Sequence, residues 1–416
     1  MKRSNFRWIV CALLFFATTI NYMDRQILGL LKPMLSKDLG WTEADYGNIV
    51  SCFQFAYGIG QFIFGRLVDI IGTKFGFTIA IIFWSIAIAG HSLAHSVFGF
   101  GGWRVALGLG EAGNFPTAIK SVAEWFPKKE RALATGLFNS GSNVGAIFAP
   151  VLVPWLALTF GWRISFVVLG ATGLVWLVFW LLFFSSPEKS RYVNKEEVDH
   201  IYSDVPEPHT ETIPMSQIIK RKETWALTMT GILVGPAWWF YLFWLPPFFD
   251  KQFGLDLKKM SLPLIFIYGF TCIGSIGGGW LSSNLLKKGW SVNAARKTAT
   301  LICAVCTVPV TFATSTTNMW ISAALFAFAA AAHQGWSANM YTVTSDIFPR
   351  RAIGSVLGLG AMVGTVTSTL FTWGVGQILQ KTHSYTPILI FCGSAYITAW
   401  LIFHLLVPRI QEVKLD

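Results

Sequence analysis

Apolar residues gather along the chain into long runs that short polar stretches separate. A helix needs roughly 20 apolar residues to cross a bilayer, and runs of this length recur from one end of the chain to the other. The twelve runs cover residues 7–30, 45–70, 76–95, 98–124, 131–158, 163–184, 223–249, 259–285, 296–313, 317–345, 352–380 and 385–408. This pattern predicts an all-α membrane protein with twelve transmembrane helices.

Composition excludes a soluble domain. Only 13% of the residues are charged and 53% are hydrophobic, whereas soluble domains have about 25% charged residues. Lys2, Arg3 and Arg7 precede the first run as in a signal peptide, but no small-residue cleavage site follows. We therefore interpret the first run as a transmembrane helix rather than a cleaved leader.

The net charge of +11 reflects the membrane topology of the chain. Basic residues cluster in alternate loops, and this alternation is the positive-inside rule. It places both termini and the long loop 185–222 in the cytoplasm and predicts a multi-pass protein of the bacterial inner membrane. The basic residues would meet anionic lipid, so we expect no nucleic-acid partner.

The chain divides into two similar parts. The polar loop 185–222 separates an N-terminal six-helix bundle, 1–184, from a C-terminal one, 223–416. "EWFPKKERA" (124–132) after the fourth run is echoed by "DIFPRRA" (346–352) after the tenth. Paired halves of this kind are a known transporter design, with the substrate site between them near the middle of the membrane.

Several motifs resemble one family. "GRLVDIIGTK" (65–74) resembles the loop signature of the major facilitator superfamily, and "NYMDRQ" (21–26) with "GGWRVALGLGEAGNFP" (101–116) looks like its anion:cation symporter branch. "WWFYLFWLP" (238–246) and "AHQGWSANMYTVTSDIFP" (332–349) are similar to segments of hexuronate transporters and their sugar-acid relatives. The resemblance implies two six-helix bundles and a cytoplasmic gating contact for Asp69. The matching loop of the second half has Ser283 where many relatives carry an acid.

Charged residues inside the apolar runs are the candidate chemistry. A charge near the bilayer centre costs upwards of about 2.5 kcal/mol, so it persists when it is paired or faces water. Arg104 and Glu111 are seven residues apart and share a helix face. We predict an ion pair between Asp24 and Arg104, which match in depth, and leave Arg25 to face the cavity or reach Glu111. The alternatives are that Arg104 snorkels to the outer interface or that Asp24 and Arg25 neutralise each other.

These residue types suit proton-coupled transport of an anion. Arg25 and Arg104 can bind a substrate carboxylate with a planar, permanently charged fork. Asp24 and Glu111 can take up protons, and a protonated acid no longer competes with the substrate for an arginine. Proton and anion binding would then favour each other, with a typical coupling of about 1–3 kcal/mol.

Polar and aromatic residues should complete a sugar-acid site, because the substrate also carries hydroxyl groups. The candidates are Tyr57, Asn114, Asn139, Trp239, Tyr241, His333, Gln334 and Asn339. The alternative for each is a lipid-facing aromatic ring or a hydrogen bond between helices. We expect Lys120, by contrast, to snorkel to the cytoplasmic interface.

Other signals carry no chemistry in this setting. Gly108, Gly110 and Gly113 spell a dinucleotide-binding motif without the strand that it requires, and Cys303 and Cys306 have no further metal ligands nearby. We expect no metal and no cofactor besides protons as the coupling ion. Glycines recur at helical spacing in the fifth, eighth and eleventh runs, and the family resemblance implies that these runs line the contact between the halves.

The sequence therefore predicts a monomeric secondary transporter that imports an organic anion with protons by alternating access. The substrate expected from the resemblance is a hexuronate such as glucuronate or galacturonate, or a related sugar acid. Coupling to Na⁺ and anion exchange stay open. A membrane enzyme is the remaining alternative, but His91 and His95 are the close histidine pair and lack acidic neighbours.

Overall fold

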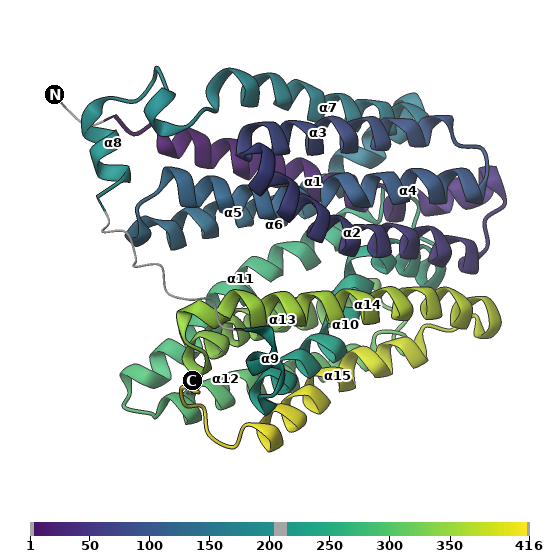
Figure 1. Ribbon diagram of the computed structural model, residues 1–416. Helices are drawn as coiled ribbons and strands as arrows, with labels where there is room; N and C mark the ends of the chain where they lie inside the picture. The colour runs from purple at the N-terminus through teal and green to yellow at the C-terminus, as the bar shows by residue number, and fades with distance from the viewer. Residues whose placement is uncertain (1–3, 204–213, 414–416) are drawn as a thin grey trace. The chain divides into compact units, whose positions relative to one another are not determined.

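A computed structural model of the protein shows an all-helical fold. The structure describes residues 4–203 and 214–413, without the side chains of residues 62, 66, 69, 128, 129, 132, 350, 351 and 354. The chain forms two compact units, Met1–Pro208 and His209–Asp416. In each unit the long helices run side by side (Figure 1).

Unit 1 holds the first six predicted crossings. Its helices are α1 (Arg7–Leu39), α2 (Glu43–Ile71), α3 (Thr73–Gly90), α4 (Val97–Glu111), α5 (Asn114–Trp125), α6 (Lys128–Phe160), α7 (Trp162–Phe183) and the short α8 (Lys195–Ile201). Short 3₁₀ turns follow α3 and α7, at His91–Leu93 and Pro187–Lys189.

Unit 2 holds the other six. Its helices are α9 (Met215–Ile219), α10 (Lys222–Phe253), α11 (Ser261–Lys287), α12 (Val292–Thr307), α13 (Met319–Ile347), α14 (Arg350–Thr382) and α15 (Thr386–Leu406), with a 3₁₀ turn at Val308–Phe312 after α12.

Local sequence signals set where several helices begin and end. Thr42 accepts a hydrogen bond from the backbone N–H of Asp45, whose carboxylate accepts one in return, and this capping box starts α2. Ser96 starts α4 by accepting from the N–H of Gly99. Gly40 ends α1 with a positive φ of 69°, a conformation that glycine adopts without strain.

Each predicted crossing is helical, but two predicted boundaries are wrong. The run 98–124 is two helices, because α4 ends at Glu111 and α5 begins at Asn114. Pro116 explains the break, since it has no N–H to donate to the carbonyl four residues earlier. The run 7–30 ends too early, because α1 continues through Pro33 to Leu39.

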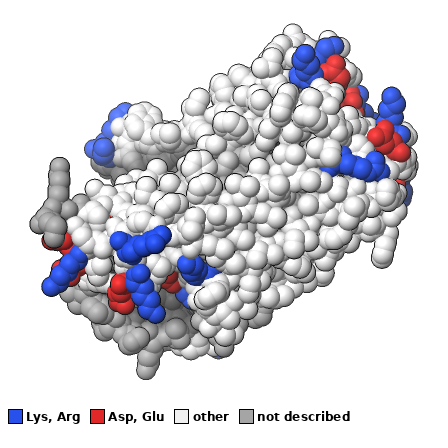
Figure 2. All heavy atoms as spheres, turned by 90° about the horizontal axis from the view of Figure 1, so that it is seen from above, with Lys and Arg blue, Asp and Glu red and all other residues white. Residues whose placement is uncertain are grey.

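Seven helices within the described ranges are long and apolar enough to cross a membrane by length and composition. The full count of twelve crossings and the cytoplasmic location of the termini stay predictions. Figure 2 shows that, on the face it displays, charged side chains gather toward its two ends and leave the surface between them largely uncharged. A band of this kind is what a bilayer requires.

The same order of helix packing recurs in both units. In unit 1, α1 packs on α6, α2 on α4 and α3 on α7; in unit 2, α10 packs on α14, α11 on α13 and α12 on α15. The acids of the repeated motif also play matching parts. Glu124 accepts a hydrogen bond from Thr73 at the start of α3, and Asp346 accepts one from Arg296 near the start of α12 at 3.0 Å.

Four of the predicted interface glycines pack within a unit. A Cβ atom added to Gly141 or Gly145 would lie 2.4 Å from the carbonyl oxygen of Phe15 or Thr19, respectively, in α1. One added to Gly274 or Gly278 would lie 2.0 or 2.3 Å from α13. These glycines let neighbouring helices of one unit approach closely, and their part in contacts between the halves stays a prediction.

Candidate functional site

Four charged residues meet inside unit 1. Asp24 and Arg25 come from α1, Arg104 and Glu111 come from α4, and the four side chains are between 0 and 2% exposed. The Arg25 Nε donates to the Glu111 Oε2 at 2.7 Å. We call these four residues the buried charge cluster. The cluster confirms that the charges of both runs point into the protein, so snorkelling of Arg104 is wrong.

Close packing of α4 on α2 sets the depth of this cluster. A Cβ atom added to Gly108 would lie 2.4 Å from the carbonyl oxygen of Phe53 in α2. The absence of a side chain at Gly108 therefore allows the two backbones to touch between Arg104 and Glu111. This contact gives the dinucleotide-like motif a packing role.

Aromatic rings enclose the Arg25 guanidinium. Its central carbon lies 4.4 Å from the ring centroid of Tyr57 and 4.7 Å from that of Tyr22. Rings at this distance attract a cation through their π electrons. Tyr57 therefore lies at the cluster, as predicted, and contacts it through its ring.

The predicted ion pair between Asp24 and Arg104 is not formed. Both Asp24 carboxylate oxygens and all three Arg104 guanidinium nitrogens are buried without a hydrogen-bond partner among the described residues. Consecutive residues of a helix point about 100° apart, and of these two residues Arg25 forms the hydrogen bond to Glu111. Arg25 pairs with Glu111, which was the second of the two positions predicted for Arg25.

Two predicted polar residues of unit 1 differ in position. Asn114, at the start of α5, is buried and its Nδ2 donates to the Thr18 hydroxyl at 3.3 Å. Asn139 lies on α6 with an exposed side chain and is not part of the buried charge cluster. Lys120 is half-buried, and its Nζ donates to the carbonyl of Val68 at 2.9 Å.

Sequence reasoning missed three buried amides. Asn21, Gln26 and Gln54 are at most 1% exposed, and their side-chain amides find no hydrogen-bond partner among the residues described here. The signal was available, because Asn21 and Gln26 flank the charged pair and Gln54 lies one turn before Tyr57.

In unit 2, Asn339 has a structural role. Its Nδ2 donates to the carbonyls of Gly278 and Gly335, each at 2.9 Å, and so joins α11 to α13. This contact is the hydrogen bond between helices that was the alternative role for Asn339. Tyr241 is buried against Phe326, and its hydroxyl lacks a hydrogen-bond partner among the described residues.

His333 belongs to a second polar group. Its Nδ1 lies 2.6 Å from the Tyr396 hydroxyl, and the Trp238 ring stacks on it at 4.6 Å with an interplanar angle of 6°. Trp238 and Tyr396 were not predicted. Gln334 is half-buried beside His333, and Trp239 stacks on Phe243 at 5.4 Å.

The remaining predictions concern a gate and metals. The side chain of Asp69 lies outside what the structure describes, so its gating contact stays a prediction. Across the described parts of the chain, no group of three or more His, Cys, Asp or Glu residues is placed to hold a metal ion.

Two similar helical units and a buried set of opposite charges have the architecture of a secondary transporter. The model of the Major Facilitator Superfamily matches residues 14–372. The chain therefore belongs to this superfamily, whose members are membrane transporters and not enzymes, and it is a multi-pass protein of the inner membrane.

Similar proteins include several transporters of sugar acids. The chain is 30% identical to the hexuronate transporter of Escherichia coli strain K12, over 93% of this chain and 90% of the relative. It is 32% identical to the galacturonate transporter of Dickeya chrysanthemi, over 70% and 86%. It is 31% identical to the probable galactarate/D-glucarate transporter of Bacillus subtilis, over 100% and 94%.

Solved structures share the fold. A D-xylose-proton symporter superposes with a TM-score of 0.74 at 15% identity, over 97% of this chain and 98% of that chain. A bacterial homologue of the human lysosomal transporter Spinster gives 0.73 at 18% identity, over 97% and 96%.

Proposed function

We propose that this protein imports a hexuronate or a related sugar acid together with protons by alternating access. The observation that carries the proposal is the difference between the two arginines of the buried charge cluster, of which only Arg25 is paired with an acid. Arg104 is 1% exposed and has three guanidinium nitrogens without a hydrogen-bond partner among the described residues. A buried cation of this kind is costly unless an anion pairs with it, and a carboxylate fits its planar fork.

The proton would act through Glu111. In its ionised form it holds Arg25 at 2.7 Å, and protonation removes the charge that attracts the guanidinium. Arg25 could then join Arg104 at the substrate carboxylate. Asp24, buried without a hydrogen-bond partner in the described part of the chain, is the second proposed proton carrier.

Neutral groups would recognise the sugar hydroxyls. In unit 1 we assign this role to Tyr57, Asn114 and Gln54, and in unit 2 to His333 with Gln334. Trp239 and Tyr241 remain candidates. Asn339 already joins α11 to α13, and Asn139 is exposed. Asp69 is the proposed cytoplasmic gate. We propose no cofactor besides protons and a monomeric transporter.

Uptake by purified protein in liposomes tests the proposal. Labelled glucuronate and galacturonate should accumulate when the outside is made acidic, with sodium absent. Glu111→Gln should bind substrate yet fail to accumulate it against a gradient, whereas Asp199→Asn should behave as wild type. Asp199 serves as the control because it is an exposed acid outside the buried charge cluster.

Three results would contradict the proposal. Accumulation driven by sodium at constant pH would replace the proton as the coupling ion. Uptake that requires a counter-anion inside would indicate exchange. A neutral hexose taken up better than the sugar acids would remove the role assigned to Arg104.

A further inference from the structure

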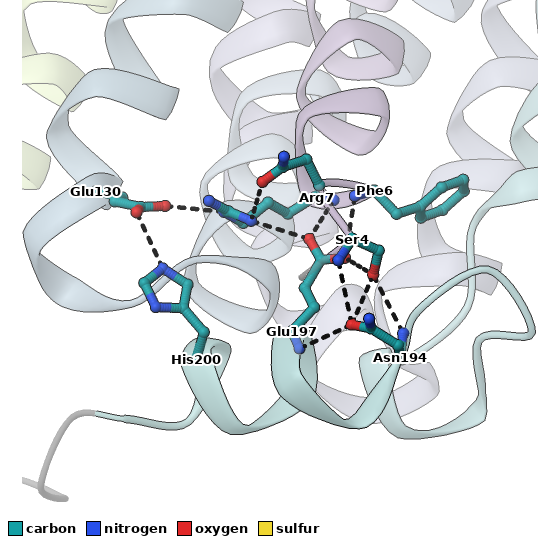
Figure 3. A network of polar contacts seen from close by, with 8 residues as sticks. Ser4, Phe6, Arg7, Glu130, Asn194, Glu197 and His200 are labelled. Carbon is teal, nitrogen blue, oxygen red and sulfur yellow. Dashed lines mark hydrogen bonds and ion pairs between the residues drawn. The ribbon is translucent and has the colours of Figure 1, made fainter. Parts of the chain in front are cut away.

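A second ionic network joins four segments of unit 1 far from the buried charge cluster along α1 (Figure 3). Ser4 and Arg7 belong to the N-terminal end of α1, Glu130 to the start of α6, and Glu197 and His200 to α8. Asn194 precedes α8 and caps it by accepting from the N–H of Glu197 at 3.1 Å. We call these six residues the clasp.

Glu197 caps α1 from a distant part of the sequence. Its carboxylate accepts from the backbone N–H groups of Phe6 at 3.0 Å and Arg7 at 3.1 Å. The first N–H groups of a helix lack partners within the helix, and α1 has neither a side-chain cap of its own nor an acid in its first turn. Glu197 supplies both the acceptor and the negative charge that this end favours.

Arg7 ties this cap to α6. Its Nη1 donates to Glu197 at 3.0 Å and its Nε to Glu130 at 2.9 Å. The Glu130 carboxylate also lies 3.0 Å from the His200 Nε2. α8 therefore contacts both α1 and α6. Glu197 and His200 are three residues apart and therefore share a face of α8.

The centre of the clasp is buried and supported by apolar packing. Glu197 is 0% exposed and Arg7 is 2% exposed. The Phe6 ring stacks on Tyr192 at 4.8 Å, and Tyr192 lies in the same loop as Asn194. Opening the clasp would leave a carboxylate and a guanidinium without their partners, which is strongly unfavourable in a buried place.

α1 connects the clasp to the buried charge cluster. Arg7 and Arg25 are 18 residues apart on one helix, about 27 Å at 1.5 Å per residue. Beyond the clasp, α1 and α6 touch through Gly141 and Gly145. A change in tilt at the clasped end of α1 would therefore shift Arg25 relative to Glu111 on α4.

We propose that α8, although part of the central loop, belongs to the transport machinery, with Glu197 as a positioning residue that keeps the ends of α1 and α6 together through every transport cycle. The consequence for transport rests on the proposed function, whereas the clasp itself does not. Glu197 touches no substrate; it acts through Arg7 and α1.

Hydrogen exchange and transport of one set of variants test this inference. In Glu197→Ala, the backbone amides of residues 6–10 should exchange at least tenfold faster than in wild type, and in Glu197→Gln by a smaller factor. The maximal uptake rate should fall at least threefold in the same order, while the half-saturating substrate concentration changes less than twofold. Asp199→Ala is the matched control, because Asp199 is an exposed acid on the same helix.

Each outcome has a definite meaning. Unchanged exchange at residues 6–10 in both Glu197 variants would overturn the clasp. Faster exchange with a wild-type maximal rate, or a rise in the half-saturating concentration alone, would overturn the positioning role. If wild type transports no sugar acid, the proposed function fails, while the exchange result still decides the clasp. If Glu197→Ala does not fold, Glu197→Gln gives the same comparison.

A cross-link tests whether the clasp stays closed. The Ser4 Oγ and Asn194 Oδ1 lie 3.0 Å apart, so a short bifunctional methanethiosulfonate reagent should join Ser4→Cys to Asn194→Cys. The cross-linked protein should transport at the rate of its reduced form. A block that reductant reverses would show that the clasp opens, and failure to cross-link would overturn its geometry. Each single cysteine variant controls for the six native cysteines, which are free.

Discussion

Arg25 and Arg104 are both buried, yet their surroundings differ. Arg25 has a carboxylate at 2.7 Å and two aromatic rings around its guanidinium. Arg104 has Phe53 at 5.7 Å from its central carbon but no hydrogen-bond partner for its nitrogens in the described residues. On the proposed mechanism Arg104 is available to a ligand at once, whereas Arg25 becomes available when Glu111 is protonated.

This difference makes a prediction about Arg104→Met. Replacing a buried guanidinium that has no hydrogen-bond partner among the described residues by an apolar side chain of similar length should raise the Tm of the ligand-free protein. The stabilisation that glucuronate confers on wild type by mass action should disappear. Thermal melts with and without glucuronate measure both effects.

Arg163 provides the control for this prediction. Arg163→Met removes an exposed arginine and should leave the glucuronate shift intact. A lower Tm for Arg104→Met without ligand would mean that the guanidinium already has a stabilising partner, and the assignment of the anion site would then be withdrawn.

At the scale of elements, glycines decide which helices touch. Gly108 has no room for a side chain, since a Cβ atom would lie 2.4 Å from the Phe53 carbonyl oxygen. Gly136 has no atom within 4 Å of such a Cβ atom in the described structure. Both lie inside helices, so the helix propensities of their substitutions are comparable.

We therefore expect opposite effects from two alanine substitutions. Gly108→Ala should destabilise the protein by about 1–3 kcal/mol, because α2 and α4 must separate, and should weaken sugar-acid binding by moving Arg104 and Glu111. Gly136→Ala should be neutral or stabilising by up to about 1 kcal/mol. Denaturation in detergent and substrate titration measure the two properties. Equal stability of the two variants would refute the close contact.

At the scale of the whole molecule, the two units have similar packing but different chemistry. The fully buried acids of the described chain, Asp24, Glu111 and Glu197, all lie in unit 1. Unit 2 offers His333, Tyr396 and Trp238 as neutral groups in mutual contact. The proposed proton chemistry therefore belongs to unit 1, and unit 2 would contribute recognition of hydroxyl groups.

The clasp also makes stability depend on pH. Burial raises the pKa of Glu197, but hydrogen bonds from Ser4, Phe6 and Arg7 outweigh it, so its pKa lies below the ordinary 4.5. For Glu130, hydrogen bonds from Arg7 and His200 likewise outweigh burial and lower the pKa. A carboxyl with a lowered folded pKa stabilises the protein above its unfolded pKa, and this contribution is lost as the pH falls through the folded pKa.

The difference in Tm between wild type and Glu197→Gln should therefore be constant from pH 7 to about 5 and shrink below the ordinary carboxyl pKa of 4.5. Melting curves across this range measure it, with Asp199→Asn as the control for an exposed acid. A difference that grows on acidification would have the wrong sign for a carboxylate stabilised in the folded state.

Much of the architecture was predictable from the sequence. Runs of apolar residues predicted helices at all twelve places, because a chain in lipid must satisfy its backbone hydrogen bonds within each segment. The repeated Phe-Pro motif anticipated the matching packing of the two units. The cluster of Asp24, Arg25, Arg104 and Glu111 was also predictable, because a charge in an apolar run must turn inward.

The partners of these charges were not predictable. Matching depth in the membrane paired Asp24 with Arg104, whereas the fold pairs Arg25 with Glu111 and places Glu197 at the start of α1. The sequence by itself determined which segments are helical and that Asp24, Arg25, Arg104 and Glu111 turn inward, since both follow from local patterns and the solvent. Only the tertiary structure decided which groups meet, because the rotation and close approach of packed helices, set by residues such as Gly108, depend on the whole unit.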